Sequence, residues 1–140
     1  MIFHCQSKPC IELKHRRRLY LMKSEMLRFL REQHRHWWER YERLYDRGAH
    51  VMPGRNGNEE WEYSEAAMEL LTRCRMFDNL YNNLLTIDLM MVDDFGNYCK
   101  RVFTEINKLK PAFPESAVSV GVFDVTLRDV RKFVMMQSDL

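Results

Sequence analysis

Positively charged side chains crowd the segment between residues 14 and 35, and their chemistry suits contacts with phosphate groups. They are Lys14, Arg16, Arg17, Arg18, Lys23, Arg28, Arg31 and Arg35. Aromatic rings, which can stack on nucleic-acid bases, accompany them at Tyr20, Trp37, Trp38 and Tyr41. An exposed face of this composition predicts nucleic-acid binding. The alternative is a solvated or internally paired face with no binding role.

The two parts of the chain carry charge of opposite sign. Residues 1–57 hold 13 Lys and Arg against 6 Asp and Glu, whereas residues 58–140 hold 9 against 14. The first part is therefore at +7 and the second at −5, within a net charge of +2. Packing of a basic helix against an acidic one would explain this division, while an exposed basic surface would attract an anionic partner. The charge count alone leaves both interpretations open.

Arg31 and His36 are separated by four residues, in the segment Arg31-Glu32-Gln33-His34-Arg35-His36. This spacing resembles the active motif of the helical HEPN ribonucleases, in which an arginine and a histidine cleave RNA. The resemblance covers six residues and implies an RNA-cleaving helical protein. Arg28 with His34 and Arg43 with His50 are spaced loosely in the same way. The family places its motif late in the bundle, with a polar, often amide, residue after the arginine, whereas Glu32 follows here.

Other motifs of site chemistry are weak or missing. His4, Cys5, Cys10 and His15 have side chains that can bind zinc, but they crowd into one short segment without the paired spacing of established zinc modules. We therefore expect no metal and no cofactor. The sequence also contains no nucleophile elbow, phosphate-binding glycine loop or dinucleotide fingerprint. These observations favour a protein that is not an enzyme.

Asp88 is the one polar residue in a run of apolar residues at helical spacing, which predicts a buried carboxylate that needs a partner. An antiparallel pairing of the first two helices would place Asp88 beside Lys23 or Ser24. The same register would place Asp78 beside His34. We expect these buried polar pairs to have a structural role.

The spacing of apolar residues predicts an all-α fold. Residues 11 to 47 contain no proline or glycine, and large apolar residues recur every three or four positions, so we expect a long helix over about 12–48. Gly48 and the turn-forming segment from Pro53 to Asn58 indicate a chain reversal. Ser64 is the expected N-cap of the next helix.

Three further helices complete the predicted antiparallel bundle. The second helix is expected over about 64–92, and a break near Asp93 to Asn97 separates it from a third over about 95–109. Val118 to Val122 alternates like a short strand, and a short C-terminal helix should cover about 125–136. The 140 residues suggest one domain, with residues 1–10 as a flexible arm.

We expect a small regulatory or interaction protein that binds another protein through an apolar helix face rich in methionine and aromatic residues. The ten methionines supply adaptable apolar surface, and a first helix of about 57 Å exceeds a compact monomer, which favours a homodimer. Sparse cysteines and the lack of a signal segment or membrane span favour the cytoplasm, as in many viral and bacterial accessory proteins. A nucleic-acid-binding protein and a HEPN-like ribonuclease are the alternatives.

Overall fold

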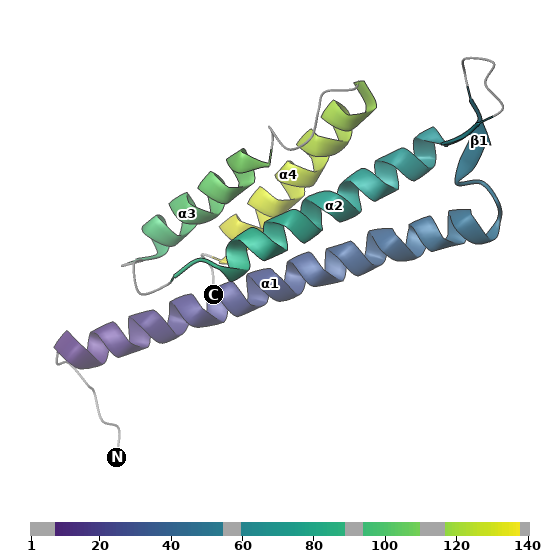
Figure 1. The fold of residues 1–140 in the computed structure, drawn as a ribbon. Coiled ribbons are helices and arrows are strands. Elements are labelled where there is room, and N and C mark those ends of the chain that lie inside the picture. Colours follow the sequence, from purple (N-terminus) through teal and green to yellow (C-terminus); the bar gives the residue numbers. More distant parts are fainter. Residues whose placement is uncertain (1–7, 55–59, 89–93, 110–116, 138–140) are drawn as a thin grey trace.

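The fold is an antiparallel helical bundle, as the sequence predicts. The computed structural model describes residues 8–54, 60–88, 94–109 and 117–137. These residues form four helices and one small hairpin (Figure 1). In chain order the elements are α1 (Lys8–Asp46), β1 (Val51–Pro53), β2 (Trp61–Tyr63), α2 (Glu65–Leu85), α3 (Phe95–Lys108) and α4 (Ala117–Gln137). Residues 1–7 of the expected arm at residues 1–10 lie outside the described residues. Residues 8–10 belong to α1.

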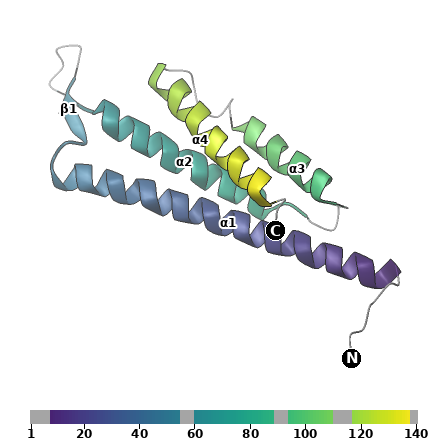
Figure 2. The same cartoon turned by 180° about the vertical axis from the view of Figure 1, so that it is seen from behind.

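Helix α1 is the longest element, with 39 residues and a length of about 58 Å. Pro9 is tolerated because it lies in the first turn, where the missing amide hydrogen would have no helical partner. Gly48 ends the helix at a positive φ of 67°, and its amide donates to the carbonyl of Tyr45. Figures 1 and 2 show that the N-terminal turns of α1 extend beyond the other helices.

The predicted chain reversal after Gly48 contains a β-hairpin, which was not predicted. Val51 pairs with Tyr63 and Pro53 with Trp61 in an antiparallel register. The ends are joined by two more backbone bonds, from Gly54 N to the carbonyl of Glu60 and from Ser64 N to the carbonyl of His50. Strands of three residues are too short to give an alternating pattern, which explains why the sequence did not reveal them.

Ser64 caps the N-terminus of α2, as predicted. Its hydroxyl accepts a hydrogen bond from Ala67 N at 3.2 Å and donates one to the carbonyl of Ala49 at 2.8 Å. One side chain therefore ends the hairpin region and begins the helix. We expect Ser64→Ala to lower the free energy of unfolding by about 0.5–2 kcal/mol, measured by urea denaturation, because an amide at the helix start loses its partner. Ser24→Ala, at an exposed position inside α1, is the control and should change stability far less.

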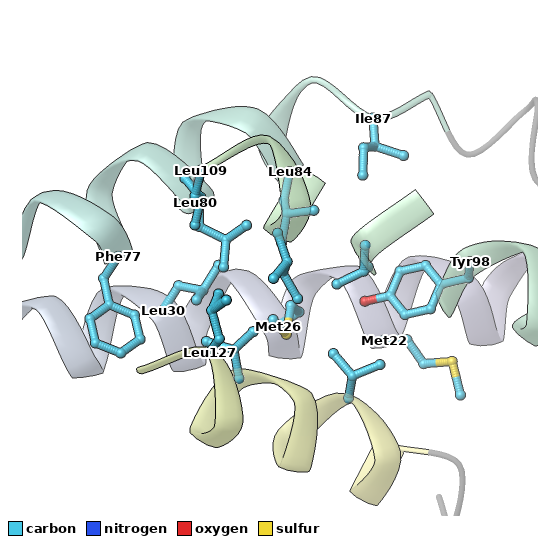
Figure 3. Packing of buried hydrophobic residues seen from close by; sticks show 14 of the residues in the cluster. Met22, Met26, Leu30, Phe77, Leu80, Leu84, Ile87, Tyr98, Leu109 and Leu127 are labelled. Carbon is cyan, nitrogen blue, oxygen red and sulfur yellow. The ribbon is translucent and has the colours of Figure 1, made fainter. Parts of the chain in front are cut away.

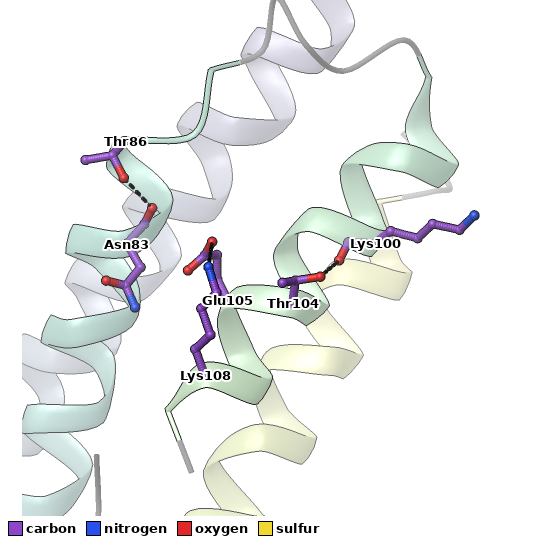
Figure 4. Close-up of polar contacts among 6 residues, drawn as sticks. All are labelled: Asn83, Thr86, Lys100, Thr104, Glu105 and Lys108. Atoms are coloured by element: carbon purple, nitrogen blue, oxygen red, sulfur yellow. Dashed lines mark hydrogen bonds and ion pairs between the residues drawn. The ribbon is translucent and has the colours of Figure 1, made fainter. Parts of the chain in front are cut away.

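Helix α2 ends at Leu85, so the prediction that it extends to residue 92 is wrong. Thr86 follows as the C-cap, and its hydroxyl donates to the carbonyl of Asn83 at 2.9 Å (Figure 4). Lys23 of α1 donates to the carbonyls of Leu85 at 3.0 Å and Ile87 at 2.8 Å. The ammonium group of Lys23 thus satisfies carbonyl groups at the negative end of the α2 dipole. The prediction was too long because the apolar spacing of the sequence continues beyond the residue at which the helix ends.

Helix α3 begins at a capping residue, and α4 has one continuous buried face. Asp94 caps α3 by accepting from Asn97 N at 2.8 Å, in agreement with the predicted break and start. The prediction of a strand at Val118 to Val122 is wrong, because α4 already begins at Ala117. The predicted helix over about 125–136 is present as part of this longer helix. Val122, Thr126, Val130 and Val134 are buried at a constant spacing of four, so helical burial overrides the local preference of valine for strands.

The hydrophobic core joins all four helices. Figure 3 shows side chains of α1 meeting those of α2, α3 and α4 in one cluster. Its members include Leu19, Met22, Met26, Leu30, Phe77, Leu80, Leu84, Tyr98, Val102, Ile106, Val130 and Val134. Phe29 and Phe133 stack at 4.1 Å between ring centroids and tie α4 to α1. The buried methionines are therefore mainly core material, as Met22, Met26 and Met76 illustrate.

One polar connection crosses this core. The buried amide of Gln137 donates from Nε2 to the carbonyl of Met22 at 2.7 Å, and its Oε1 accepts from the hydroxyl of Tyr98 at 3.4 Å. Burial raises the pKa of Tyr98, so this hydroxyl keeps its proton and its role as a donor. Gln137 thus links the end of α4 to α1 and α3.

Candidate functional site

The predicted basic residues lie mostly on the outside of α1. Lys14, Arg17, Arg18, Arg28, Arg31 and Arg35 are exposed, while Arg16 and Lys23 are half-buried. Arg28 pairs with Glu32 of the same helix at 3.3 Å, and Arg31 donates to the hydroxyl of Tyr81 at 2.7 Å. Exposed guanidinium groups on this face are available to an anionic partner.

A groove runs between the C-terminal half of α1 and the N-terminal half of α2, with a volume of about 770 Å³. Its lining residues are Trp37, Arg40, Arg43, Leu44, Asp46, Arg47, Ala66, Glu69, Leu70 and Arg73. Trp37, Leu44 and Leu70 are half-buried and supply the apolar part of the lining, whereas Arg40, Arg43 and Arg47 are exposed at its edge. We call this set of residues the arginine groove.

Two arginines of the groove are held against one indole ring. The guanidinium carbon of Arg73 lies 4.3 Å from the ring centroid of Trp37, and that of Arg40 lies 5.3 Å from it. Cation–π contacts of this kind contribute about 0.5–1 kcal/mol at exposed sites. Trp37 therefore positions one cation from each helix at the same place in the groove.

The charge of the groove is positive. Its four arginines face two carboxylates, Asp46 and Glu69, which leaves a formal excess of two positive charges. Arg47 donates from Nε to the carbonyl of Arg43 at 3.4 Å, near the last turn of α1. An apolar lining with a cationic edge can hold an anionic ligand that also presents apolar groups.

A second feature is a row of rings on α1 and the following turn, which we call the aromatic stripe: His34, Trp38, Tyr41, Tyr45 and His50. Trp38 lies 6.4 Å from His34 and 5.3 Å from Tyr41 between ring centroids. His50 lies 4.4 Å from Tyr45. Its exposed members are Trp38 and Tyr45, with 41% and 59% of the side chain open to solvent, whereas His34, Tyr41 and His50 are half-buried.

Tyr41 and His50 connect the stripe to the β-hairpin. Burial, followed by the nearby hydroxyl of Tyr63 and its hydrogen bond, raises the pKa of Tyr41. Nδ1 of His50 is buried and has no hydrogen-bond partner among the described residues. Tyr63 is 52% exposed, so the hairpin extends the same ring-rich surface.

Comparison of the chain with protein-family models, curated proteins and solved structures finds no match. Function must therefore be inferred from geometry. The arginine groove and the aromatic stripe are the two surfaces of the described chain that combine a defined shape or composition with accessible chemistry.

The carboxylates of the predicted buried polar pairs are not buried. Asp88 and Asp78 are both exposed, and His34 is half-buried and stacks on Trp38. Asp88 follows the end of α2 by three residues, so the helical phase that suggested its burial no longer applies. Lys23 has the structural role that was expected, but its partners are backbone carbonyls.

The buried carboxylate of the described chain is Glu105 on α3, which is 7% exposed. Its Oε1 lies 3.1 Å from Nζ of Lys108, one turn later on the same helix (Figure 4). Glu105 lies three residues after Val102 and directly before Ile106, both fully buried, which is the signal that the sequence offered. This pair within one helix has a structural role.

Arg31 and His36 have different surroundings in the structure. Arg31 contacts Tyr81 on α2, whereas the ring of His36 lies edge-on to Trp37 at 4.8 Å. Five residues of α-helix turn through about 500°, so the two side chains leave α1 in directions about 140° apart. This geometry gives no support to a joint role for the pair within one molecule.

The remaining expectations concern metals and membranes. His4 and Cys5 lie outside the described residues, and the described chain contains no group of three or more His, Cys, Asp or Glu that could hold a metal ion. Among the helices of the described segments, none has the length and apolar character needed to cross a membrane.

Sequence reasoning did not identify the four arginines of the groove as a site: Arg40, Arg43, Arg47 and Arg73. The first three are spaced by three and four residues at the end of α1 and in the turn after it, a signal that was available in the sequence. Arg73 joins them only because α1 and α2 pair in antiparallel register, which brings it to Trp37.

Proposed function

We propose that the protein is a non-enzymatic binding protein that holds an acidic, amphipathic segment of another protein in the arginine groove. The observation that carries this proposal is the convergence of four arginines, from α1, the turn after it and α2, around a partly apolar groove of about 770 Å³. An amphipathic helix binds by placing its apolar side chains in such a groove. Its acidic residues would then face the arginines at the edge.

The apolar lining favours a protein ligand over a nucleic-acid backbone at this position. A phosphate backbone offers charge but no apolar side chains for Trp37, Leu44 and Leu70. A protein segment with alternating acidic and apolar positions uses both parts of the lining. Arginine and tryptophan are also the residue types that most often dominate binding energy at protein interfaces.

The proposed surface differs in composition from the methionine-rich face expected from the sequence. Met22, Met26 and Met76 are buried, and Met68, Met135 and Met136 are the methionines among the exposed large apolar residues of the described chain.

We keep the cytoplasm as the proposed location and a homodimer as the proposed oligomeric state. Sedimentation velocity of the purified protein tests the dimer directly.

A designed peptide tests the proposal. The probe is a fluorescein-labelled helical peptide with leucines on one face and glutamates on the other, and binding is measured by fluorescence anisotropy. Arg40→Glu combined with Arg73→Glu should weaken binding on the order of tenfold to a hundredfold, because two attractive contacts become repulsive. The matched control is Arg17→Glu with Arg18→Glu, which makes the same charge change at exposed positions outside the groove.

Two further peptides separate the contributions of charge and apolar contact. Replacing the glutamates with lysines should abolish binding, and replacing the leucines with serines should weaken it strongly. Equal losses in the groove variant and in the Arg17 and Arg18 variant would show that only net charge matters. Such a result, or unchanged binding in the groove variant, would overturn the proposal.

A further inference from the structure

The aromatic stripe is built along one side of α1 by helical spacing. Its four members on this helix, His34, Trp38, Tyr41 and Tyr45, follow one another at intervals of three and four residues, which places them on one face. Arg31 precedes His34 by three residues on the same face. From Arg31 to Tyr45 this face is about 21 Å long. The arginine groove is lined by other residues of α1, and no residue belongs to both surfaces. The stripe is therefore a separate surface.

The exposure of the stripe's rings and of Tyr63 is not explained by the stability of the fold. Trp38 is 41%, Tyr45 59% and Tyr63 52% exposed, although burying such rings would stabilise the fold. Trp38 donates from Nε1 to Oε1 of Glu42 at 2.6 Å, which fixes the indole along the helix. Trp38 and Tyr45 each have a ring neighbour in the stripe and remain partly exposed, so their accessible ring surface can stack on a flat ligand.

Cations adjoin the rings at the end of the stripe nearer the middle of α1. Arg31 is exposed, and one of its amino groups donates to the hydroxyl of Tyr81, which orients the guanidinium while leaving other donors free. Arg35 is exposed one turn further along and precedes Trp38 by three residues. Rings that follow directly after two exposed cations match a ligand with flat and anionic parts.

We propose that the aromatic stripe binds single-stranded nucleic acid, with unpaired bases on Trp38 and Tyr45 and phosphates at Arg31 and Arg35. Stacking on exposed aromatic side chains needs bases whose faces are free, and in a duplex neighbouring pairs cover those faces. The single strand is therefore preferred to the duplex. This proposal concerns a second ligand and does not rest on the function proposed for the arginine groove.

Fluorescence anisotropy with a labelled oligouridylate, and with an RNA duplex of equal length, tests the inference. Wild-type protein should bind the single strand more tightly than the duplex at low salt. Trp38→Ala should weaken single-strand binding on the order of tenfold, whereas Trp38→Phe should retain most of the affinity. Leu85→Ala is the control, since Leu85 is 51% exposed at the far end of α2 and lies outside the stripe and the hairpin.

The salt dependence tests the phosphate contacts separately. Arg35→Gln should reduce the slope of log affinity against log salt by about 0.7, the amount expected for one phosphate contact of a single strand. The proposal is overturned if the oligouridylate does not bind at low salt, or if the duplex binds equally well. It is also overturned if Trp38→Ala and Leu85→Ala have equal effects, or if Trp38→Ala changes self-association and leaves oligonucleotide binding intact.

Discussion

Replacing Leu30 with alanine is expected to lower the free energy of unfolding by about 2–5 kcal/mol. Leu30 is fully buried in the middle of α1, in the cluster that joins α1 to the other three helices. Its removal leaves a cavity that neighbours from several elements cannot all move to fill. A single domain is stable by only about 5–15 kcal/mol, so this one change removes a large part of the total. Urea denaturation followed by circular dichroism measures the loss.

Leu21→Ala provides the matched control on the same helix. Leu21 is 58% exposed, so the same chemical change should alter stability by no more than about 0.5 kcal/mol. A large loss at position 21 together with a small one at position 30 would mean that α1 presents a different face to the bundle. Both proposed binding surfaces depend on that face, so they would have to be withdrawn as well.

The pairing of α1 and α2 could be predicted because two strong local signals fix its ends. Gly48 stops one helix through a positive φ, and Ser64 starts the next by capping. With both ends fixed, the antiparallel register follows, and the contact between Arg31 and Tyr81 lies where that register places it. Apolar spacing of three and four residues then identifies Leu19, Met22, Met26 and Leu30 as the buried stripe.

The parts of the fold that were predicted wrongly depend on tertiary contacts. Val118 to Val122 has a strand-like pattern, yet the chain is helical there because Val122 continues a buried face through Val130 and Val134. The end of α2 is fixed by Lys23, which is far away in the sequence. Local helix propensity does not show where a helix ends when a side chain of another helix binds its last carbonyl groups.

The same distinction applies to the candidate sites. The basic residues and several aromatic residues of the first helix were recognised from composition as a candidate surface, but the sequence left open whether this surface is exposed or paired internally. The arginine groove was not found, because it needs Arg73 from α2 beside Trp37 from α1. Nor does composition reveal that Trp37 is engaged by arginines while Trp38 presents an open ring.

Alkylation of Cys74 by iodoacetamide at pH 8 is expected to be about a hundredfold slower in the folded protein than in the unfolded chain. Burial raises the pKa of the Cys74 thiol from its ordinary value of 9.0 to about 11. Only the thiolate reacts, and two pKa units reduce its population at pH 8 by about a hundredfold. Restricted access at 3% exposure slows the reaction further. Mass spectrometry of the peptide containing residue 74 gives the rate without interference from the other three cysteines.

The same pKa shift predicts how stability depends on pH. The folded state favours the neutral thiol of Cys74, whose Sγ lies 3.9 Å from the carbonyl of His34 below the aromatic stripe. This contribution to stability is fully present below pH 9 and is lost as the pH rises toward about 11, because the unfolded chain releases the proton first. Cys74→Ala should remove that part of the pH dependence. Rapid alkylation of folded wild-type protein at pH 8 would instead show that α1 and α2 separate readily at this level, which would leave neither the arginine groove nor the aromatic stripe with a rigid support.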